Sequence, residues 1–334
     1  MTKHLNKTIL VLLTVASLLG ASPIPWPAYQ GPGVSGRFMA LSGAAAGVRD
    51  DAALVFWNPA GLAFMQWPMA TAGYTQSAGV LSDPLFSGPK RLNYLAFTGQ
   101  SGGFAWRSLA RYQQETAAAA GPDTAFDYLK YSVDEFALAF AKKDDTYPAI
   151  ALGLSAKLIW ARLTQQTQAT TGGSYGRAAL TDENGVGYGL DLGLAWTQQP
   201  LRLFANFQNL LAKVYFRAVP DDKPKVRATG GVAWQQGGGP ALSLGVEKYL
   251  YRGSPRLQYM AAAEYKRAIE NFGAVTGRIG YAGHYRAKQD YSWSWGLGYL
   301  YGKFLLDAAA VNQRDPGDGS WKATYVGSVS LFLN

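Results

Sequence analysis

The sequence of 334 residues contains no cysteine, so a disulfide framework, a thiolate nucleophile and a cysteine-based metal site are all excluded. Charged residues are also scarce, at 16% of the chain, whereas a typical soluble domain has roughly 25%. By contrast, glycine is abundant, with 39 residues, and aromatic residues reach 13%. This combination favours a β protein whose surface contacts lipid.

Histidine is scarce too. The chain has two histidines, and only His284 lies beyond the N-terminal segment, with Asp290 nearby. A membrane hydrolase can use one histidine with a serine and an acid. No serine-centred elbow accompanies His284, however, and a solvated loop histidine is the simpler interpretation. The sequence also lacks a metal-ligand cluster, a phosphate-binding loop and a nucleic-acid module. It therefore predicts a protein that is not an enzyme and has no cofactor, bound metal or nucleic-acid partner.

The amino terminus has the pattern of a secretory signal peptide. Lys3 and Lys7 precede an apolar run over 9–19, and small residues follow at 20–22. The alternative is a membrane anchor, but the run is shorter than the roughly 20 apolar residues of a spanning helix. We therefore expect a signal peptide over 1–22. No later segment has the length and apolarity of a membrane helix.

What recurs along the rest of the chain is alternation of apolar and polar residues. In the segment 241–250, the apolar residues Leu242, Leu244 and Val246 share one parity, and the other parity holds Ser243, Gly245 and Glu247. The segments 187–196 and 291–301 follow the same rule, with aromatic residues among their large apolar side chains. Period-two alternation predicts strands, and aromatic residues near the ends of the apolar face are typical of outer-membrane barrels.

About fourteen such segments follow residue 67. We place them at 68–80, 90–99, 103–114, 129–142, 147–163, 185–197, 200–210, 224–235, 240–250, 256–267, 271–283, 291–301, 303–313 and 320–333. Every second link is short, whereas the others include long polar links at 115–128, 164–184 and 211–223. Short periplasmic turns opposite longer external loops are the asymmetry of an outer-membrane barrel.

Backbone hydrogen bonding then requires the sheet to close, because an open edge in hydrocarbon leaves N–H and C=O groups without partners. We therefore expect an all-β protein: a closed antiparallel transmembrane β-barrel of about fourteen strands over 68–334, in the bacterial outer membrane. Outer-membrane lipids and the barrel-assembly machinery are its expected partners.

The segment 36–64 differs from the strands because it is rich in glycine and alanine. We expect a plug, or hatch, over 23–67 on the periplasmic side. Pro59 fixes its own φ and restrains Asn58, so this pair predicts a turn or break. Two interpretations of the distinctive residues remain open: they fold the plug, or they gate the pore. The hatch and gating candidates are Arg49, Asp50, Asp51, Trp57, Asn58, Pro59 and Ala60. The three charged ones could pair with the barrel wall.

Charged residues on the lumen-facing parity are mostly basic. The basic ones are Arg107, Arg111, Lys157, Arg202, Arg227, Lys266 and Arg278, and the acidic ones are Glu135, Asp191, Glu247 and Glu264. One interpretation is a preference for an anionic head group, since arginine offers a bidentate fork to carboxylates. The arginines are the candidates for that role. The other interpretation is a charge ladder that braces the barrel, because polar interiors are usual in such barrels.

The plug motif resembles a known family. Arg37, the Gly/Ala run, Asp50-Asp51 and Trp57-Asn58-Pro59-Ala60-Gly61-Leu62 are similar to the hatch of the FadL-type long-chain fatty-acid transporter superfamily. Within that superfamily, Asn206-Phe207-Gln208-Asn209-Leu210 and Arg278-Ile279-Gly280-Tyr281 resemble the PorV/PorQ-like branch. The resemblance implies a fourteen-stranded barrel with an amino-terminal plug that passes hydrophobic or amphiphilic small molecules such as long-chain fatty acids. The alternative that it implies is a PorV-like component of type IX protein secretion, whose partners would be secreted cargo and secretion-system proteins.

Overall fold

The computed structural model describes the chain in ten stretches. They are residues 34–44, 50–78, 91–120, 123–171, 174–175, 179–236, 239–250, 257–285, 291–314 and 319–333. Within strands, the backbone alone is described for 110–120, 123–129, 167–171, 174–175 and 179–180. The predicted signal peptide and Arg49 lie outside the described residues. Among the described residues, no helix is long and apolar enough to cross a membrane.

Fourteen long strands account for most of the described chain. Their bounds are β1 (Met69–Ala78), β2 (Arg91–Gly99), β3 (Gly102–Ala120), β4 (Asp123–Lys143), β5 (Ile150–Thr171), β7 (Ala179–Gln198), β8 (Leu201–Tyr215), β9 (Arg227–Gln235), β10 (Ala241–Tyr249), β11 (Gln258–Ile269), β12 (Gly273–His284), β13 (Tyr291–Tyr301), β14 (Phe304–Arg314) and β15 (Trp321–Phe332). The two-residue strand β6 (Ser174–Tyr175) pairs with the end of β5.

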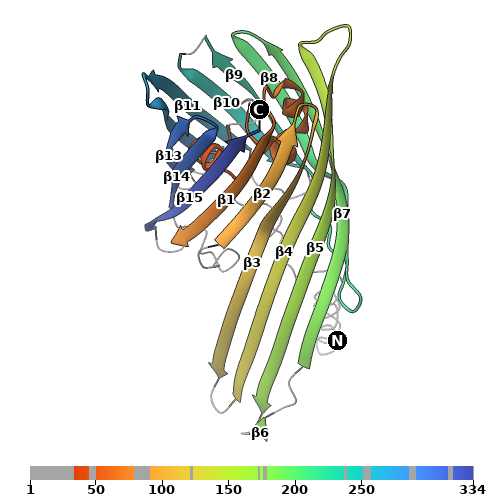
Figure 1. The fold of residues 1–334 in the computed structure, drawn as a ribbon. Coiled ribbons are helices and arrows are strands. Elements are labelled where there is room, and N and C mark those ends of the chain that lie inside the picture. Colours follow the sequence, from red (N-terminus) through yellow and green to blue (C-terminus); the bar gives the residue numbers. More distant parts are fainter. Residues whose placement is uncertain are drawn as a thin grey trace.

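The fourteen long strands form one closed antiparallel barrel (Figure 1). Each pairs with its neighbour in sequence, β5 pairs directly with β7, and β1 pairs with β15 to close the ring. The closing pair runs from Met69 opposite Phe332 to Ala78 opposite Ala323. Closure leaves no sheet edge around the ring, as a lipid environment requires. The predicted fold class is thereby confirmed.

The two faces of the barrel follow the alternation of the sequence. On β10, the outward side chains of Leu242, Leu244 and Val246 are exposed, whereas Ser243 and Glu247 on the other parity are buried. The same division holds on β13, where the exposed side chains include tryptophans and tyrosines. An apolar outer surface with aromatic side chains around a polar interior is the arrangement that spans an outer membrane.

One part of the predicted strand map is wrong. The segments 115–128 and 164–184 are not long polar loops, because β3 and β4 pair as far as Ala120 opposite Asp123, and β5 and β7 pair as far as Thr167 opposite Ala179. Strands β3, β4, β5 and β7 therefore extend well beyond the other strands (Figure 1). A strand outside the membrane needs no apolar face, since pairing alone satisfies its backbone. The polar composition of these two segments therefore led to the wrong prediction that they are loops.

The links at the opposite end of the barrel are short, as predicted. They run over 100–101, 144–149, 199–200, 236–240, 270–272 and 302–303. The predicted link at 211–223 is also a long connection, although β8 continues to Tyr215 before it begins. The two ends of the barrel are therefore a short-turn end and an end that carries the tall four-strand extension.

Among the described residues, three short helices lie in the lumen near the short-turn end (Figure 1). They are α2 (Gly36–Ala40), α3 (Leu54–Trp57) and the 3-10 helix η3 (Pro59–Phe64). Helix α2 lies against β12 to β15, whereas α3 and η3 lie against β3, β4, β5 and β7. Most of their side chains are buried, including Phe38 and Phe56. We call residues 34–44 and 50–64 the plug.

Candidate functional site

The second part of the plug turns sharply at Asn58 and Pro59. Helix α3 ends at Trp57, Asn58 is extended with φ −163° and ψ 90°, and η3 begins at Pro59. The missing N–H and fixed φ of proline suit the first position of a helical turn. The break that the Asn-Pro pair predicts is therefore present, and it places Asn58, Pro59 and Ala60 against the barrel wall.

Two glycines of the wall receive this turn. A Cβ on Gly153 of β5 would lie 2.1 Å from the backbone nitrogen of Ala60, and a Cβ on Gly193 of β7 would lie 2.4 Å from Asn58 Oδ1. Both distances are far below van der Waals contact, so neither position tolerates a side chain without movement of the plug or the strand. The sequence analysis did not single out these glycines, although their lumen-facing parity was a usable signal.

Two amides of β8 hold the carbonyl groups at the end of α3. Asn206 Nδ2 donates to Trp57 O at 2.6 Å, and Gln208 Nε2 donates to Phe56 O. Both side chains are buried, with exposures of 1% and 2%. Buried amide donors satisfy carbonyls that a short helix leaves without intrahelical partners. The Asn206–Leu210 motif of the sequence is thus an attachment point for the plug.

Aromatic rings of the plug contact cations of the wall. Trp57 stacks on Phe38 with ring centroids 4.1 Å apart, which joins the two parts of the plug. The guanidinium group of Arg227 lies 4.6 Å from the centre of the Trp57 ring, and that of Arg107 lies 4.3 Å from the centre of the Phe56 ring. Arginine over an aromatic face is a favourable electrostatic contact, so two of the predicted lumen arginines support the plug.

The first part of the plug is attached by hydroxyl groups and by one ion pair. Ser328 Oγ accepts from the backbone N–H of Gly36 at 3.0 Å, and Ser294 Oγ donates to Ala40 O at 2.8 Å. The hydroxyl groups of Ser42 and Ser294 are 2.7 Å apart. These contacts fix α2 against β13 and β15.

The ion pair joins Arg37 of α2 to Glu264 of β11. Arg37 Nε and Nη2 donate to the two carboxylate oxygens at 2.9 and 2.8 Å, which is a bidentate contact. Glu264 also accepts from Arg278 Nε at 2.6 Å, and Arg278 Nη1 donates to Asp307 Oδ1 at 2.5 Å. The result is a chain of alternating charges from the plug into the wall.

The aspartates of the predicted hatch cluster stabilise the plug itself. Asp50 Oδ1 accepts from the Gln66 N–H at 2.8 Å, and Asp51 accepts from the Ala53 N–H at 2.8 Å and from Ser35 Oγ at 3.2 Å. Burial raises the pKa of the Asp51 carboxyl above its ordinary value, and the Arg37 guanidinium acts in the opposite direction. In place of the predicted pairing with the wall, the two aspartates make contacts within residues 35–66. The Ala53 contact of Asp51 is a local turn contact, whereas the Gln66 and Ser35 contacts each join residues 16 positions apart.

Other predicted lumen charges pair with one another inside the wall. Arg107 Nη2 lies 2.9 Å from Glu135 Oε1, and Lys157 Nζ lies 2.8 Å from Asp191 Oδ1. A third pair joins Arg227 Nη1 to Glu247 Oε2 at 3.5 Å. We call these three pairs the charged belt. Such pairs fit the interpretation of a bracing charge ladder. Arg111 lies on β3, where the backbone alone is described, and Arg202 Nη2 donates to Gln235 Oε1 at 2.9 Å.

An apolar cluster on the inner wall was missed by the sequence analysis. We call it the inner apolar cluster. It lies farther from the short-turn end than the charged belt, and Phe216 and Val219 pack against it. Its members are Leu109, Tyr131, Val133, Ile159, Ala161, Leu163 and Val214. The segment 158–163 carried the signal, since both of its parities are largely apolar, as in a strand that is buried on both faces.

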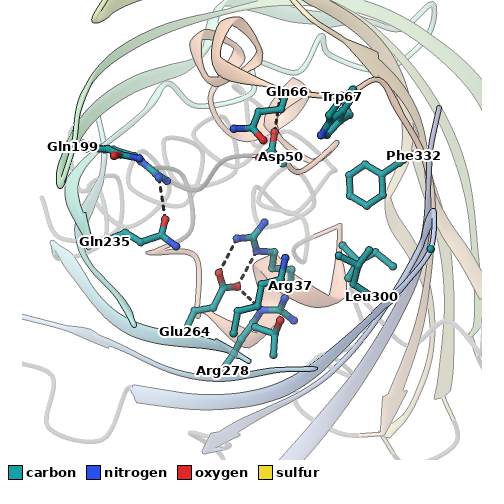
Figure 2. A pocket seen from close by; sticks show the side chains of 15 residues that line it. Arg37, Asp50, Gln66, Trp67, Gln199, Gln235, Glu264, Arg278, Leu300 and Phe332 are labelled. Carbon is teal, nitrogen blue, oxygen red and sulfur yellow. Dashed lines mark hydrogen bonds and ion pairs between the residues drawn. The ribbon is translucent and has the colours of Figure 1, made fainter. Parts of the chain in front are cut away.

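A cavity of about 450 Å³ lies beside the plug at the short-turn end. Figure 2 shows Trp67, Leu300 and Phe332 on one side of it and Gln199 and Gln235 on the opposite side. The Arg37–Glu264–Arg278 contacts form a third side. The volume is within the range of small-molecule sites, roughly 300 to 1,000 Å³. The cavity thus combines an apolar wall with a charged one.

No group of His, Cys, Asp and Glu side chains that could hold a metal ion occurs among the residues that the structure describes. The cavity beside the plug has the volume and the mixed lining to hold a small molecule. The closed barrel with its apolar exterior and filled lumen defines the class: this is a bacterial outer-membrane β-barrel with an internal plug.

Two solved structures of similar fold are toluene transporters by their descriptions, and a third is a FadL homologue. The toluene transporter TbuX of Ralstonia pickettii matches with a TM-score of 0.58 at 14% identity, over 90% of this chain and 99% of that one. The toluene transporter TodX of Pseudomonas putida matches at 0.57 and 12%, over 90% and 98%. A Pseudomonas aeruginosa FadL homologue matches at 0.53 and 12%, over 90% and 98%. The TM-scores establish a shared fold, and at identities this low the similarity establishes the fold alone.

Neither a protein-family model nor a curated protein sequence matches the chain significantly. The FadL-like architecture that the plug motif implied is thus found in the fold. The PorV/PorQ-like branch stays a prediction.

Proposed function

We propose that this barrel carries hydrophobic or amphiphilic small molecules, such as long-chain fatty acids, passively across the outer membrane through its lumen. The inner apolar cluster is the observation that carries the proposal. The interiors of transmembrane barrels are usually polar, so a buried apolar surface formed by Ile159, Leu163 and their neighbours needs a reason. Its members are at most 1% exposed, and Phe216 and Val219 pack against them. A lumen in which the ligand takes the place of Phe216 and Val219 on this surface supplies such a reason.

The order of features along the lumen supports the same function. A ligand that enters from the extension end meets the inner apolar cluster first, then the belt of paired charges, and then the plug. Beyond the plug it reaches the cavity, whose wall again includes Trp67 and Phe332. Apolar side chains therefore lie on both sides of the plug. The solved structures of similar fold, two of which are toluene transporters, support this function by analogy.

The direct test is uptake by liposomes that contain the purified barrel. We expect a radiolabelled long-chain fatty acid to enter these liposomes faster than protein-free ones. The variant Ile159→Asn places an amide in the inner apolar cluster and should slow uptake severalfold. Ile269→Asn, at an exposed position on β11, is the matched control and should not. Heat-modifiable migration on gels would confirm that both variants fold.

A deletion strain separates transport from the type IX secretion alternative. Loss of fatty-acid uptake with an unchanged set of secreted proteins would support transport. Normal uptake with a depleted set of secreted proteins would contradict it and favour the secretion component. The absence of other type IX components from the genome would remove that alternative.

A further inference from the structure

One cation lies on the lipid-facing side of the adjacent strands β12 to β15 and β1. On the outward parity of these strands, Arg314 is the one charged residue among those described. It lies at the extension end of β14, and its Nε donates to Gly319 O at 3.1 Å. Among the described residues, no carboxylate contacts its guanidinium group. A cation at the membrane interface without a carboxylate partner is a recognition point for an anionic lipid head group.

A groove of about 280 Å³ lies on the same face, closer to the short-turn end. Small residues form its floor, namely Ala308 and Ala310 of β14 and Gly327 of β15. Trp295 of β13 and Tyr325 of β15 stand on either side of Ala310, because both pair with it in register. An apolar groove between two large rings on the lipid face suits an acyl chain.

Two further features lie next to Arg314. Tyr291 of β13 and Trp321 of β15 flank β14, and their rings meet edge to face with centroids 5.4 Å apart. Asn312 of β14 is partly exposed, but its Nδ2 is covered and has no hydrogen-bond partner in the described part of the chain. A buried donor without an acceptor is unfavourable. Rotation of the amide would bring Nδ2 to the exposed side, where an oxygen of a lipid can accept from it.

The spacing along β14 matches one leaflet of the membrane. Ala308 and Arg314 are separated by about 20 Å of strand, at roughly 3.4 Å per residue. With a strand tilt of about 40°, this is about 15 Å of depth, or half of a hydrocarbon core about 30 Å thick. Because the short turns of such barrels are periplasmic, Arg314 lies at the head groups of the outer leaflet. A lipid held there can place an acyl chain in the groove.

We propose that β13, β14 and β15 bind a phosphorylated glycolipid of the lipid A type from the outer leaflet. Arg314 contacts its phosphate, for which the planar guanidinium fork is well suited. Asn312 donates to a carbonyl oxygen at the root of an acyl chain, and that chain lies in the groove. The Tyr291–Trp321 ring pair contacts the sugar, which a phospholipid such as phosphatidylglycerol lacks. The site is on the outside of the barrel and is independent of transport through the lumen.

Titration with defined lipids tests the proposal. The purified barrel is stripped of bound lipid in detergent and titrated with diphosphoryl lipid A, with phosphatidylglycerol or with phosphatidylethanolamine. Native mass spectrometry counts the bound lipids. We expect one lipid A to bind about tenfold more tightly than either phospholipid.

Two pairs of variants locate the site. Arg314→Gln should weaken the binding of lipid A about tenfold, because a charge-assisted contact is lost. Arg267→Gln, an exposed cation at the short-turn end of β11, is its control and should bind normally. Ala308→Leu fills the groove and should also weaken binding, whereas Ala261→Leu, on the outward parity of β11 opposite Leu244, should not. If Arg314→Gln fails to fold, the two alanine variants still decide the question.

Equal affinity for phosphatidylglycerol and lipid A would overturn the glycolipid class of ligand. Unchanged affinity of Arg314→Gln would overturn the phosphate contact. That result is also expected if Asp315 and Asp318, which lie outside the described residues, neutralise Arg314. Fatty-acid uptake by liposomes should be normal in Arg314→Gln. Loss of uptake by the folded variant would contradict a site that is confined to the lipid face.

Discussion

The two described parts of the plug are attached to the barrel by different chemistry. Residues 50–64 sit over Gly153 and Gly193 and are held by the buried amides of β8. Residues 34–44 are held by serine hydroxyl groups and by a partly exposed ion pair. Both parts rest on wall glycines, since a Cβ on Gly280 would lie 2.8 Å from Ser42 N. They differ in their polar contacts, because the hydroxyl and ionic contacts of residues 34–44 include a partly exposed pair at a cavity, whereas the amide contacts of residues 50–64 are buried.

This difference suggests a division of roles within the plug. The part that contains α3 and η3 acts as a fixed seat, and the part that contains α2 acts as the movable element. The stacked rings of Phe38 and Trp57 join the two parts. Release of α2 would break the Phe38–Trp57 stack and the polar contacts and would expose the buried side chains of Val34, Phe38 and Leu41. Removal of the whole plug would expose the rest of the same core cluster as well.

Two cysteine reporters make the comparison testable. Val34→Cys reports on the α2 part, and Val55→Cys, at a fully buried position of α3, reports on the other. Both replace a buried valine with a side chain of similar size. We expect both thiols to react slowly with a water-soluble maleimide in the resting barrel.

The largest effect is expected from Gly153→Ala. The added Cβ would lie 2.1 Å from Ala60 N and 2.3 Å from Pro59 C, both backbone atoms. Overpacking typically lowers the free energy of unfolding by ~1–3 kcal/mol and occasionally by more, and contact with two backbone atoms places Gly153→Ala at or above the upper end of that range. The reaction of Val55→Cys should accelerate more than that of Val34→Cys. Gly277→Ala is the control, because a Cβ there would meet nothing within 4 Å. An equal effect of Gly277→Ala would contradict the claim that residues 50–64 are held by close packing on Gly153.

A smaller effect is expected from Gln208→Leu. This change leaves the Phe56 carbonyl without the amide donor of Gln208 and removes an acceptor from Arg227. A buried polar group that loses its partner costs about 1–3 kcal/mol. Urea unfolding in lipid bilayers measures the loss, and Val55→Cys should again be the more affected reporter. If Gln208→Leu accelerated the reaction of Val34→Cys alone, residues 34–44 and not residues 50–64 would depend on the amide of Gln208.

The smallest effect is expected from Ser294→Ala. The variant removes the hydroxyl that contacts Ala40 O and Ser42, and a neutral hydrogen bond contributes about 0.5–1.5 kcal/mol. Global unfolding should change little, while the Val34→Cys thiol should react faster. Unchanged reactivity of Val34→Cys would show that these serines do not hold α2.

The sequence was sufficient for those features that depend on local pattern. Alternation such as Leu242, Leu244 and Val246 located the strands and their lipid face, and the Asn58-Pro59 pair located the break in the plug. Polarity failed at 115–128 and 164–184, because a strand outside the membrane can be polar on both faces. The inner apolar cluster was overlooked because the lumen-facing parity was read for charge alone.

The partners of the plug lay beyond the reach of the sequence. Asn206 meets Trp57 across 149 positions, and Arg37 meets Glu264 across 227. Such contacts depend on the register of every intervening strand and on closure of the ring. The alternation of the sequence therefore predicts that an arginine points into the lumen, but it does not predict which residue the arginine contacts. The contact of Gly153 with Ala60 is likewise not predictable from the sequence.

The most direct test is to lock α2 to the wall and measure transport. Ser42 and Ser294, whose hydroxyl oxygens are 2.7 Å apart, are replaced together by cysteine in the otherwise cysteine-free chain. Uptake of a radiolabelled fatty acid by liposomes is then compared before and after reduction. If α2 must leave the wall, the oxidised barrel will not transport and a reductant will restore uptake. Equal uptake by the oxidised and reduced forms would contradict a movable α2.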